Sequence, residues 1–283
     1  MAEGSALKLL LAGLKFAEGP RWHDGRLWFS DFYSHRVFAV GLDGKAETIV
    51  EVPGQPSGLG WTPEGRLLIV SMLDRKVLEL TGRGLRTVAD LSQVATGPCN
   101  DMVVDSAGRA YVGNFGFDRE RGESPRTTCL ARVDPDGTVS VAADDLMFPN
   151  GAVITPDGKT LIVGETFANR LTAFDVKKDG TLSKRRVFAE LPGAYPDGCC
   201  LDAEGAIWVA DPGGHRVIRV FEGGRIDREI STGEQNAFAC MLGGEKRTTL
   251  FVCTSTGSGS AMAEKNDGRI EYVEVNVPGA GLP

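Results

Sequence analysis

Short apolar runs separated by tight turns make up most of the chain. Runs such as LWFS, LLIV, AYVG and TLIVG are followed by polar residues and preceded by Asp-Gly, Glu-Gly or Ala-Gly pairs. Runs of four to seven apolar residues are too short for most globular helices and are typical of β-strands. The 37 glycines fit frequent tight turns. The pattern predicts a protein that is mostly β.

One unit of this kind occurs six times. The six copies read WHDGRLWFSD, WTPEGRLLIVS, VDSAGRAYVGN, ITPDGKTLIVGE, LDAEGAIWVAD and MLGGEKRTTLFVCT. Their turn glycines are Gly25, Gly65, Gly108, Gly158, Gly205 and Gly244, 39 to 50 residues apart. Each copy is followed by a third apolar run, and the first five copies by a fourth. Four strands per repeat at this spacing indicate the blades of a β-propeller.

The two ends of the chain complement each other. The sixth unit stops after RIEYVEVNV without a fourth strand, whereas residues 6–12 form a strand-like segment before the first unit. We therefore expect an all-β, six-bladed propeller of four-stranded blades, in one domain over residues 1–283. The N-terminal strand would complete the last blade and close the ring. The alternative, a two-domain β-sandwich, explains neither the regular repeat nor the missing strand.

Composition and charge narrow the possible partners. Hydrophobic residues make up 42% of the chain and can fill a sizeable core. The net charge of −7 and the lack of a basic stripe argue against nucleic acid as a partner. The N-terminal ALKLLLAGL is too short for a membrane span and lacks a basic leader, so we expect a cytoplasmic protein with no membrane partner. The oligomeric state stays open.

The six cysteines mostly lie in or beside apolar runs. None has the paired spacing of a zinc site. Because we expect a reducing compartment, buried free thiols are favoured over disulfides.

Polar residues open the strands that should line the central channel. In a blade, the residue that opens the first strand lies on the face opposite the turn that follows. Counting back from the turns gives Glu18, Ser57, Asn100, Asn150 and Asp197 for blades one to five, and Asn236 or Ala237 for blade six. Two carboxylates and two amides would thus converge on one point, with no lysine or arginine among them. Since unpaired buried carboxylates are costly, a cation is their natural partner.

The donor types indicate which cation. Carboxylate and carbonyl oxygens suit Ca²⁺, Mg²⁺ or Mn²⁺, and Zn²⁺ or Fe²⁺ where fewer ligands are present. We expect one divalent ion, with Ca²⁺ as the first choice. For any one position alone, a simpler interpretation holds, since Asn-Gly and Asp-Gly suit turns in which the side chain bonds local backbone. Equivalent placement in four blades favours the cation instead.

Four stretches of the chain resemble the family that joins senescence marker protein (regucalcin), gluconolactonases and luciferin-regenerating enzyme. They are AEGPRWHDGRLWFSD, CNDMVVDSAGRAYVGN, FPNGAVITPDGKTLIV and YPDGCCLDAEGAIWVADP. The resemblance implies one catalytic divalent cation, held by Glu18, Asn150 and Asp197. It implies that Asn100 contacts the cation or the substrate. The activity that it implies is lactone hydrolysis, with phosphotriester hydrolysis in related propellers.

One departure from the family bears on the substrate. An arginine that contacts the substrate in regucalcin-like members is replaced here by Pro98. A sugar-acid lactone is therefore a weaker expectation for this chain than lactone hydrolysis itself, and a more apolar lactone is the alternative.

A bound cation would polarise the lactone carbonyl and stabilise the oxyanion. Asp197 is the expected general base that activates the attacking water. In an alternative mechanism, hydroxide on the cation attacks and Asp197 serves only as a ligand; the sequence leaves both open. Asp101 follows Asn100 and is expected to orient it. Asp31 and Asp211 end second strands, where we expect them to bond loop backbone rather than act in catalysis.

Aromatic residues gather on the loops of the same face. We expect Phe115, Phe117, Phe148 and Tyr195 to contact the substrate in a pocket with apolar walls, or else to cap the core between blades. The long loops 114–128 and 254–268 return on this face and are expected to set specificity. A hypothesis from another class is a calcium-binding or interaction propeller without catalysis. Such a module would more often present a broad platform than a pocket.

Overall fold

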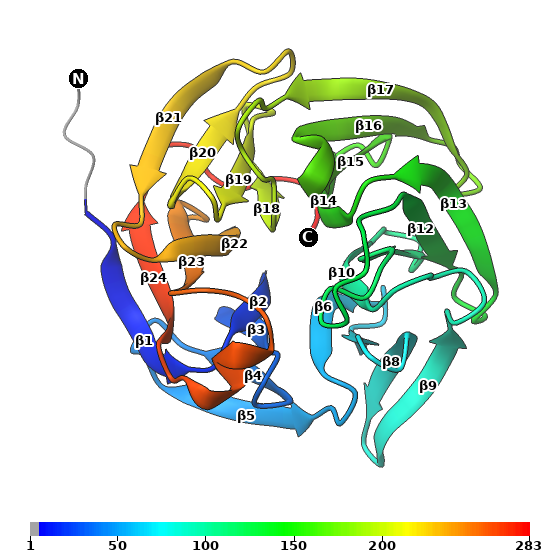
Figure 1. The fold of residues 1–283 in the computed structure, drawn as a ribbon, viewed down its shortest axis with the longest axis horizontal. Helices are drawn as coiled ribbons and strands as arrows, with labels where there is room; N and C mark the ends of the chain where they lie inside the picture. The colour runs from blue at the N-terminus through cyan, green and yellow to red at the C-terminus, as the bar shows by residue number, and fades with distance from the viewer. Residues whose placement is uncertain (1–5) are drawn as a thin grey trace.

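Six antiparallel sheets of four strands each surround a central channel (Figure 1). The structure, a computed structural model, describes residues 6–283. The first three blades comprise β2 (Ala17–His23), β3 (Arg26–Asp31), β4 (Arg36–Val40) and β5 (Ala46–Glu51); β6 (Pro56–Trp61), β7 (Leu67–Ser71), β8 (Lys76–Thr81) and β9 (Gly84–Asp90); and β10 (Cys99–Val104), β11 (Ala110–Asn114), β12 (Thr128–Val133) and β13 (Val139–Leu146). The predicted all-β six-bladed propeller is confirmed.

The other three blades complete the ring. They comprise β14 (Pro149–Ile154), β15 (Thr160–Glu165), β16 (Arg170–Val176) and β17 (Leu182–Glu190); β18 (Cys199–Leu201), β19 (Ile207–Asp211), β20 (Arg216–Val220) and β21 (Ile226–Ser231); and β22 (Asn236–Gly243), β23 (Thr249–Ser255), β24 (Gly268–Glu274) and β1 (Lys8–Leu14). The N-terminal strand β1 pairs antiparallel with β24, as predicted. This pairing covers an edge that the sixth blade would otherwise expose.

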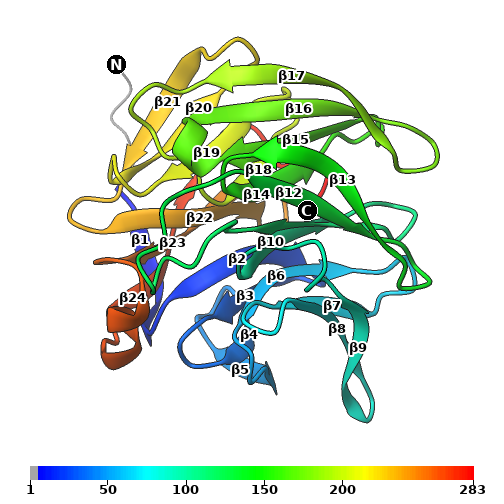
Figure 2. The same ribbon diagram turned by 45° about the vertical axis from the view of Figure 1, so that its right-hand side comes forward.

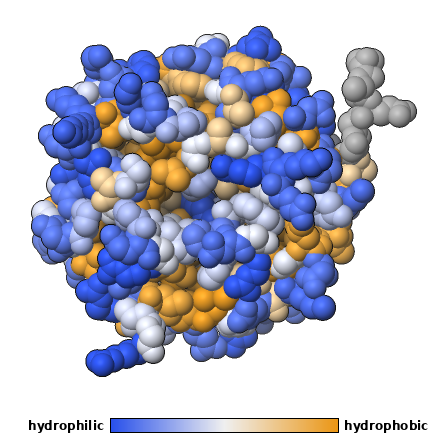
Figure 3. Space-filling view, turned by 180° about the vertical axis from the view of Figure 1, so that it is seen from behind, coloured by the Kyte–Doolittle hydropathy of each residue, from blue (hydrophilic) through white to orange (hydrophobic). Residues whose placement is uncertain are grey.

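Burial follows the distance of a strand from the channel. All six residues of the inner strand β14 are buried, whereas most of the outer strand β13 is exposed or half-buried. In the turned view the inner strands β2, β6, β10, β14 and β22 lie side by side around the centre (Figure 2). Inner strands are packed on both faces, whereas outer strands keep one face in water. From behind, hydrophilic side chains dominate the surface and apolar patches lie between them (Figure 3).

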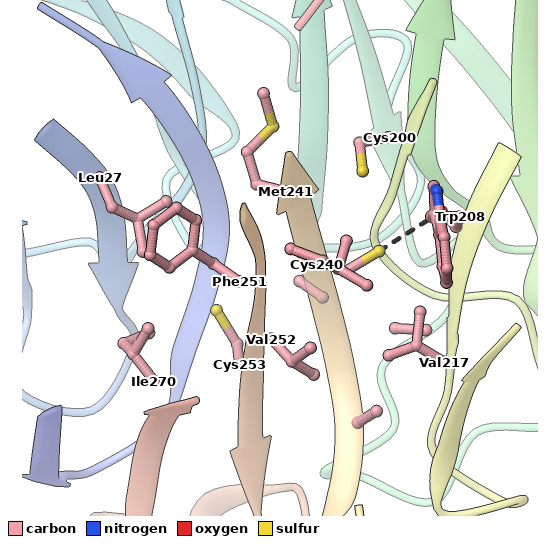
Figure 4. Packing of buried hydrophobic residues seen from close by; sticks show 14 of the residues in the cluster. Leu27, Cys200, Trp208, Val217, Cys240, Met241, Phe251, Val252, Cys253 and Ile270 are labelled. Carbon is pink, nitrogen blue, oxygen red and sulfur yellow. Dashed lines mark hydrogen bonds between the residues drawn. The ribbon is translucent and has the colours of Figure 1, made fainter. Parts of the chain in front are cut away.

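Apolar side chains fill the space between neighbouring blades. In the largest cluster Phe251 of β23 packs beside Leu27 of β3, and Cys240 of β22 faces Trp208 of β19 (Figure 4). The Cys240 thiol donates a hydrogen bond to the carbonyl of Trp208, with Sγ and O 3.4 Å apart. Full burial of side chains of this size contributes about 1.5–3 kcal/mol each. All six cysteines are buried free thiols, as predicted.

The last residues of the chain cross one end of the channel. Leu282 and Ile154 exchange two backbone hydrogen bonds, of 2.8 and 2.9 Å, and Gly279 pairs with Asp202. Ile154 ends β14, whereas Asn150 lies near its start, about 13 Å away at the usual rise of a strand. The tail therefore lies at the channel end opposite to Asn150.

The remaining regular elements are two 3-10 turns, η1 (Thr166–Ala168) and η2 (Ser260–Glu264). Over residues 6–283, no helix has the length and apolar character needed to cross a membrane.

Candidate functional site

The predicted donors meet at one end of the channel. Glu18 of β2, Asn100 of β10, Asn150 of β14 and Asp197, just before β18, all line one cavity of about 560 Å³. Ser57 lies behind them, where its hydroxyl donates to Oδ1 of Asn100 at 3.3 Å. The four donors follow one another at intervals of 47 to 82 positions in the sequence and still reach one point, because each opens the innermost strand of its blade.

Blade six contributes no donor to this point. Asn236 pairs with Ser255 at the end of β23, and its amide donates to the carbonyl of Pro212 at 3.0 Å. In blade six the residue after the backbone pair of Asn236 with Ser255 is Ala237, which is buried. In blade four the residue after the equivalent backbone pair is Asn150. The register that the sequence left open is therefore resolved in favour of Ala237.

A bulge and a glycine follow most of the donors. The pairing of the inner strand shifts just after the opening position in blades one, two, three, four and six. A bulge re-aims the side chains beside it. The next residue is often glycine because the inner strands come very close: a Cβ on Gly151 would lie 2.6 Å from the backbone nitrogen of Cys199. A Cβ on Gly198 would lie 2.5 Å from the Cβ of Ala239.

A chain of hydrogen bonds orients the two amides. The Thr166 hydroxyl donates to the carbonyl of Pro196 at 2.8 Å, and so accepts from Nδ2 of Asn150 at 3.2 Å. Oδ1 of Asn150 then accepts from Nδ2 of Asn100 at 3.0 Å, and Oδ1 of Asn100 accepts from Ser57. Because a carbonyl can only accept, the direction of every bond in this chain is fixed. Sequence reasoning missed Thr166, which stands outside the repeated strand pattern.

A buried ion pair lies below the donors. Arg21 of β2 contacts Asp101 of β10, with Nη2 and Oδ1 2.6 Å apart, and both side chains are almost fully buried. Arg21 also donates to the carbonyls of Leu59 and Met102. The prediction that no arginine accompanies the carboxylates thus holds for the opening residues alone. The sequence offered one signal for this ion pair, namely a charged residue in an inner strand.

Asp101 has partners other than the expected one. Its Oδ1 accepts from Arg21 and from the backbone nitrogen of Met102 at 2.8 Å. Asn100 is held instead by Ser57 and Asn150. In the structure, Asp101 therefore neutralises Arg21 and does not orient Asn100.

Burial disfavours the charged form of both carboxylates. Burial and the negative charge of Asp197 hold the pKa of Glu18 well above its ordinary value, against the backbone N–H of Gly19, which donates to Oε2 at 2.9 Å. Burial raises the pKa of Asp197 to about 7, opposed by a hydrogen bond from Asn150 and by the positive charge of Arg119. A cation between the carboxylates would relieve this cost.

The donor chemistry fits a hard divalent cation. Within residues 6–283, no three His, Cys, Asp or Glu side chains are grouped for metal binding. The donors at this point are instead two carboxylates and two amides, which supply the oxygen ligands that Ca²⁺ and Mg²⁺ prefer. The set contains no thiolate or imidazole, which are the ligands that softer metals prefer.

Aromatic rings form the walls above the donors. They are Phe16, Phe32, Tyr33, Phe115, Phe148, Phe167, Tyr195 and Phe238. Phe115 stacks on Phe148, with ring centroids 4.5 Å apart. Of the predicted substrate contacts, Phe115, Phe148 and Tyr195 line the cavity, but Phe117 does not. It is buried, and its ring packs against Phe148 and Phe167, with centroids 5.9 and 6.0 Å apart.

The two long loops meet over the cavity. Glu120 of the 114–128 loop accepts hydrogen bonds from the backbone nitrogen of Ser260 at 3.1 Å and from its hydroxyl at 2.6 Å. Both loops also line the cavity.

The acids that end second strands hold the segments leading to the donors. Oδ1 of Asp31 accepts from the backbone nitrogen of Phe16 at 2.8 Å, and Oδ1 of Asp211 accepts from that of Tyr195 at 3.0 Å. Each of these nitrogens lies two residues before a carboxylate of the site. The predicted structural role of both acids is confirmed.

Fold and site together define a six-bladed propeller with an oxygen-donor centre at the floor of an aromatic cavity. The chain belongs to the SMP-30/gluconolactonase/LRE-like family, and the region that defines this family matches residues 16–256. The resemblance inferred from the sequence is thereby confirmed.

Named relatives of the chain include lactonases. It is 27% identical to a 6-deoxy-6-sulfogluconolactonase of Pseudomonas putida over 276 residues, which cover 94% of this chain and 93% of the relative. It is 27% identical to a pentonolactonase of Haloferax volcanii, over 89% of this chain and 86% of the relative. A solved structure of a calcium-binding protein, regucalcin, from Agrobacterium tumefaciens superposes with a TM-score of 0.83 at 21% identity, covering 99% and 97% of the two chains. At that identity the likeness shows the fold alone.

Proposed function

We propose that this protein is a lactonase that works with one divalent cation, Ca²⁺ being the first choice and Mg²⁺, Mn²⁺, Zn²⁺ or Fe²⁺ the alternatives. The observation that carries the proposal is the convergence of Glu18, Asp197, Asn100 and Asn150 on the floor of one aromatic cavity. The lactonase names of two relatives support the reaction class.

Glu18, Asn150 and Asp197 would hold the cation, with Asn100 beside it. When bound, a divalent cation supplies a Lewis acid that polarises the lactone carbonyl and stabilises negative charge on its oxygen. Asn100 uses one amide proton on Asn150, and the second is available to a substrate oxygen. The hydrogen bond that Asn150 donates to Thr166 fixes the orientation of its amide, whose oxygen faces Asn100.

Asp197 carries the proton through the reaction. Its carboxylate takes a proton from the attacking water as the water oxygen bonds to the carbonyl carbon. The bond between that carbon and the ring oxygen then breaks, and Asp197 returns the proton to the leaving ring oxygen. Ring opening in this way needs no other reactant. The aromatic walls exclude bulk water and hold the apolar body of the substrate.

The shape of the site favours a small-molecule enzyme over an interaction platform. A cavity of about 560 Å³ lies within the usual range for small-molecule sites. The C-terminal tail lies at the opposite end of the channel, so substrates would enter from the face with the long loops.

The test is lactone hydrolysis, followed with a pH indicator, on protein stripped by a chelator and reloaded separately with each cation. The panel contains gluconolactone, xylonolactone, γ-butyrolactones and aromatic lactones. We expect no turnover after stripping and recovery with at least one cation. Full turnover without any cation would contradict the metal-dependent mechanism. Silence with every cation would refute lactone hydrolysis, and phosphotriesters would be tested next, before a non-catalytic calcium-binding module.

A further inference from the structure

Three consecutive charged residues of the 114–128 loop face the cavity. They are Asp118, Arg119 and Glu120, and they join Glu18 and Asp197 of the floor as the charged side chains that line it. The two acids of the loop have partners within the protein. Asp118 pairs with Arg121 at 3.4 Å, and both carboxylate oxygens of Glu120 accept hydrogen bonds from Ser260.

Arg119 is the one cation of the cavity wall, and in the part of the chain that the structure describes its guanidinium has neither an ion pair nor a hydrogen bond. The other arginines of the loop are occupied. Arg121 pairs with Asp118, and Arg126 pairs with Glu123 at 3.2 Å and donates to the carbonyl of Gly116 at 2.7 Å.

Arg119 lines the same cavity as Tyr33 of the wall and Asp197 of the floor. A bound divalent cation would balance the charges of Glu18 and Asp197. The guanidinium of Arg119 would then still lack a negatively charged partner among the described residues.

We propose that Arg119 binds an anionic substituent of the substrate, so that the preferred lactone is an apolar ring system bearing a carboxylate, sulfonate or phosphate group. The lactone carbonyl would lie at the floor, the apolar body against the aromatic rings and the anionic group at Arg119. A guanidinium presents paired donors that match the oxygens of such groups. This inference rests on the proposed lactonase function.

The first experiment compares phthalide, a neutral aromatic lactone, with carboxyphthalide, which carries an added carboxylate. Wild type, Arg119→Met, Arg119→Lys and Arg83→Met are assayed in the cation-loaded form. Arg83 is exposed in the turn between β8 and β9, so its replacement makes the same change in net charge outside the cavity.

We expect Arg119→Met to lower kcat/KM for carboxyphthalide about 10- to 100-fold, mainly through a higher KM, because it removes one charge-assisted contact. Turnover of phthalide should change by less than about twofold, and Arg119→Lys should retain part of the preference. Arg83→Met should match wild type on both lactones. Equal losses on both lactones would show that Arg119 only shapes the loop and would overturn the proposal.

Binding of the corresponding lactams separates this inference from the reaction itself. Isoindolinone and carboxyisoindolinone keep the ring shape but resist hydrolysis, and calorimetry measures their affinity without turnover. Tighter binding of the carboxylate, lost in Arg119→Met, supports the anion site even if no lactone is hydrolysed. A preference for the carboxylate that persists in Arg119→Met would place the anion on the cation instead and would refute the role of Arg119.

Discussion

The side-chain amide of Asn150 donates to the hydroxyl of Thr166, with Nδ2 and Oγ1 3.2 Å apart. The hydroxyl proton is already given to the carbonyl of Pro196, so Thr166 can only accept from Asn150. The amide is thereby held with its nitrogen toward Thr166 and its oxygen toward Asn100. A residue outside the donor set thus decides which atom of Asn150 faces Asn100.

Replacing Thr166 by valine should weaken cation binding. The change keeps the shape of the side chain but removes the acceptor that fixes the Asn150 amide. We expect a 10- to 100-fold loss of calcium affinity, the usual range for residues that orient a ligand. Isothermal titration calorimetry on chelator-treated protein measures it.

Thr166→Ser is the matched control, because it keeps the hydroxyl and should bind calcium nearly as well as wild type. Equal affinity of the valine and serine variants would show that the hydroxyl does not orient Asn150.

Asp197→Asn should leave the propeller folded and remove most lactone turnover. The amide keeps the size of the side chain but cannot accept the proton from water. We expect a loss of at least about 100-fold in kcat, the lower range for general acid–base groups. Asp157→Asn, in the exposed turn of blade four, is a control that removes an equal charge outside the site. Near wild-type rates for Asp197→Asn would refute its assigned role.

Without a cation, the protein should become less stable as the pH rises toward neutrality. Burial raises the pKa of Asp197 to about 7 in the folded state, above the value of about 3.9 in an unfolded chain. The folded state therefore holds the proton more tightly, and the stability that the proton gives is lost as the pH rises through that range. Glu18, whose pKa burial also raises, acts in the same direction.

Urea denaturation of chelator-treated protein between about pH 5 and about pH 8 measures this dependence. The free energy of unfolding should fall with pH, and Asp197→Asn should flatten the curve. Calcium should restore stability mainly at the upper end. A free energy that rises over this range in cation-free wild type would contradict the prediction.

Breaking the buried ion pair should strongly destabilise the fold. Arg21→Met leaves the carboxylate of Asp101 buried without its partner, which typically costs about 3–5 kcal/mol. Asp101→Asn added to Arg21→Met removes the unpaired charge and should recover part of the loss. Denaturant unfolding of the two variants and wild type gives the free energies. A double variant no more stable than Arg21→Met would show that the loss comes from the missing hydrogen bonds to backbone carbonyls.

The blade architecture and most of the donor set could be read from the sequence. Repeated turns gave the number of blades, the missing fourth strand gave the closure by β1, and counting back from the turns gave Glu18, Asn100, Asn150 and Asp197. These inferences succeed because strand pattern and turn position are local properties that recur in each repeat.

The supporting contacts could not be read in the same way. Thr166 lies in η1, outside the repeat, and the partner of Asp101 is an arginine from another blade. Phe117 belongs to the same loop as Phe115, yet only Phe115 lines the cavity. Which way a side chain turns depends on packing against segments far away in the sequence.

The sequence by itself determined a ring of six similar sheets and the positions at which polar residues open its inner strands, because hydrophobic periodicity and turn residues act over a few neighbours. Only the tertiary structure decided which atoms face one another there. It set the direction of the amide of Asn150, the pairing of Arg21 with Asp101 and the place of Arg119 in the cavity wall. These contacts depend on bulges, on the paths of the loops and on ring closure. Because all six blades contribute to them, no single sequence position predicts them.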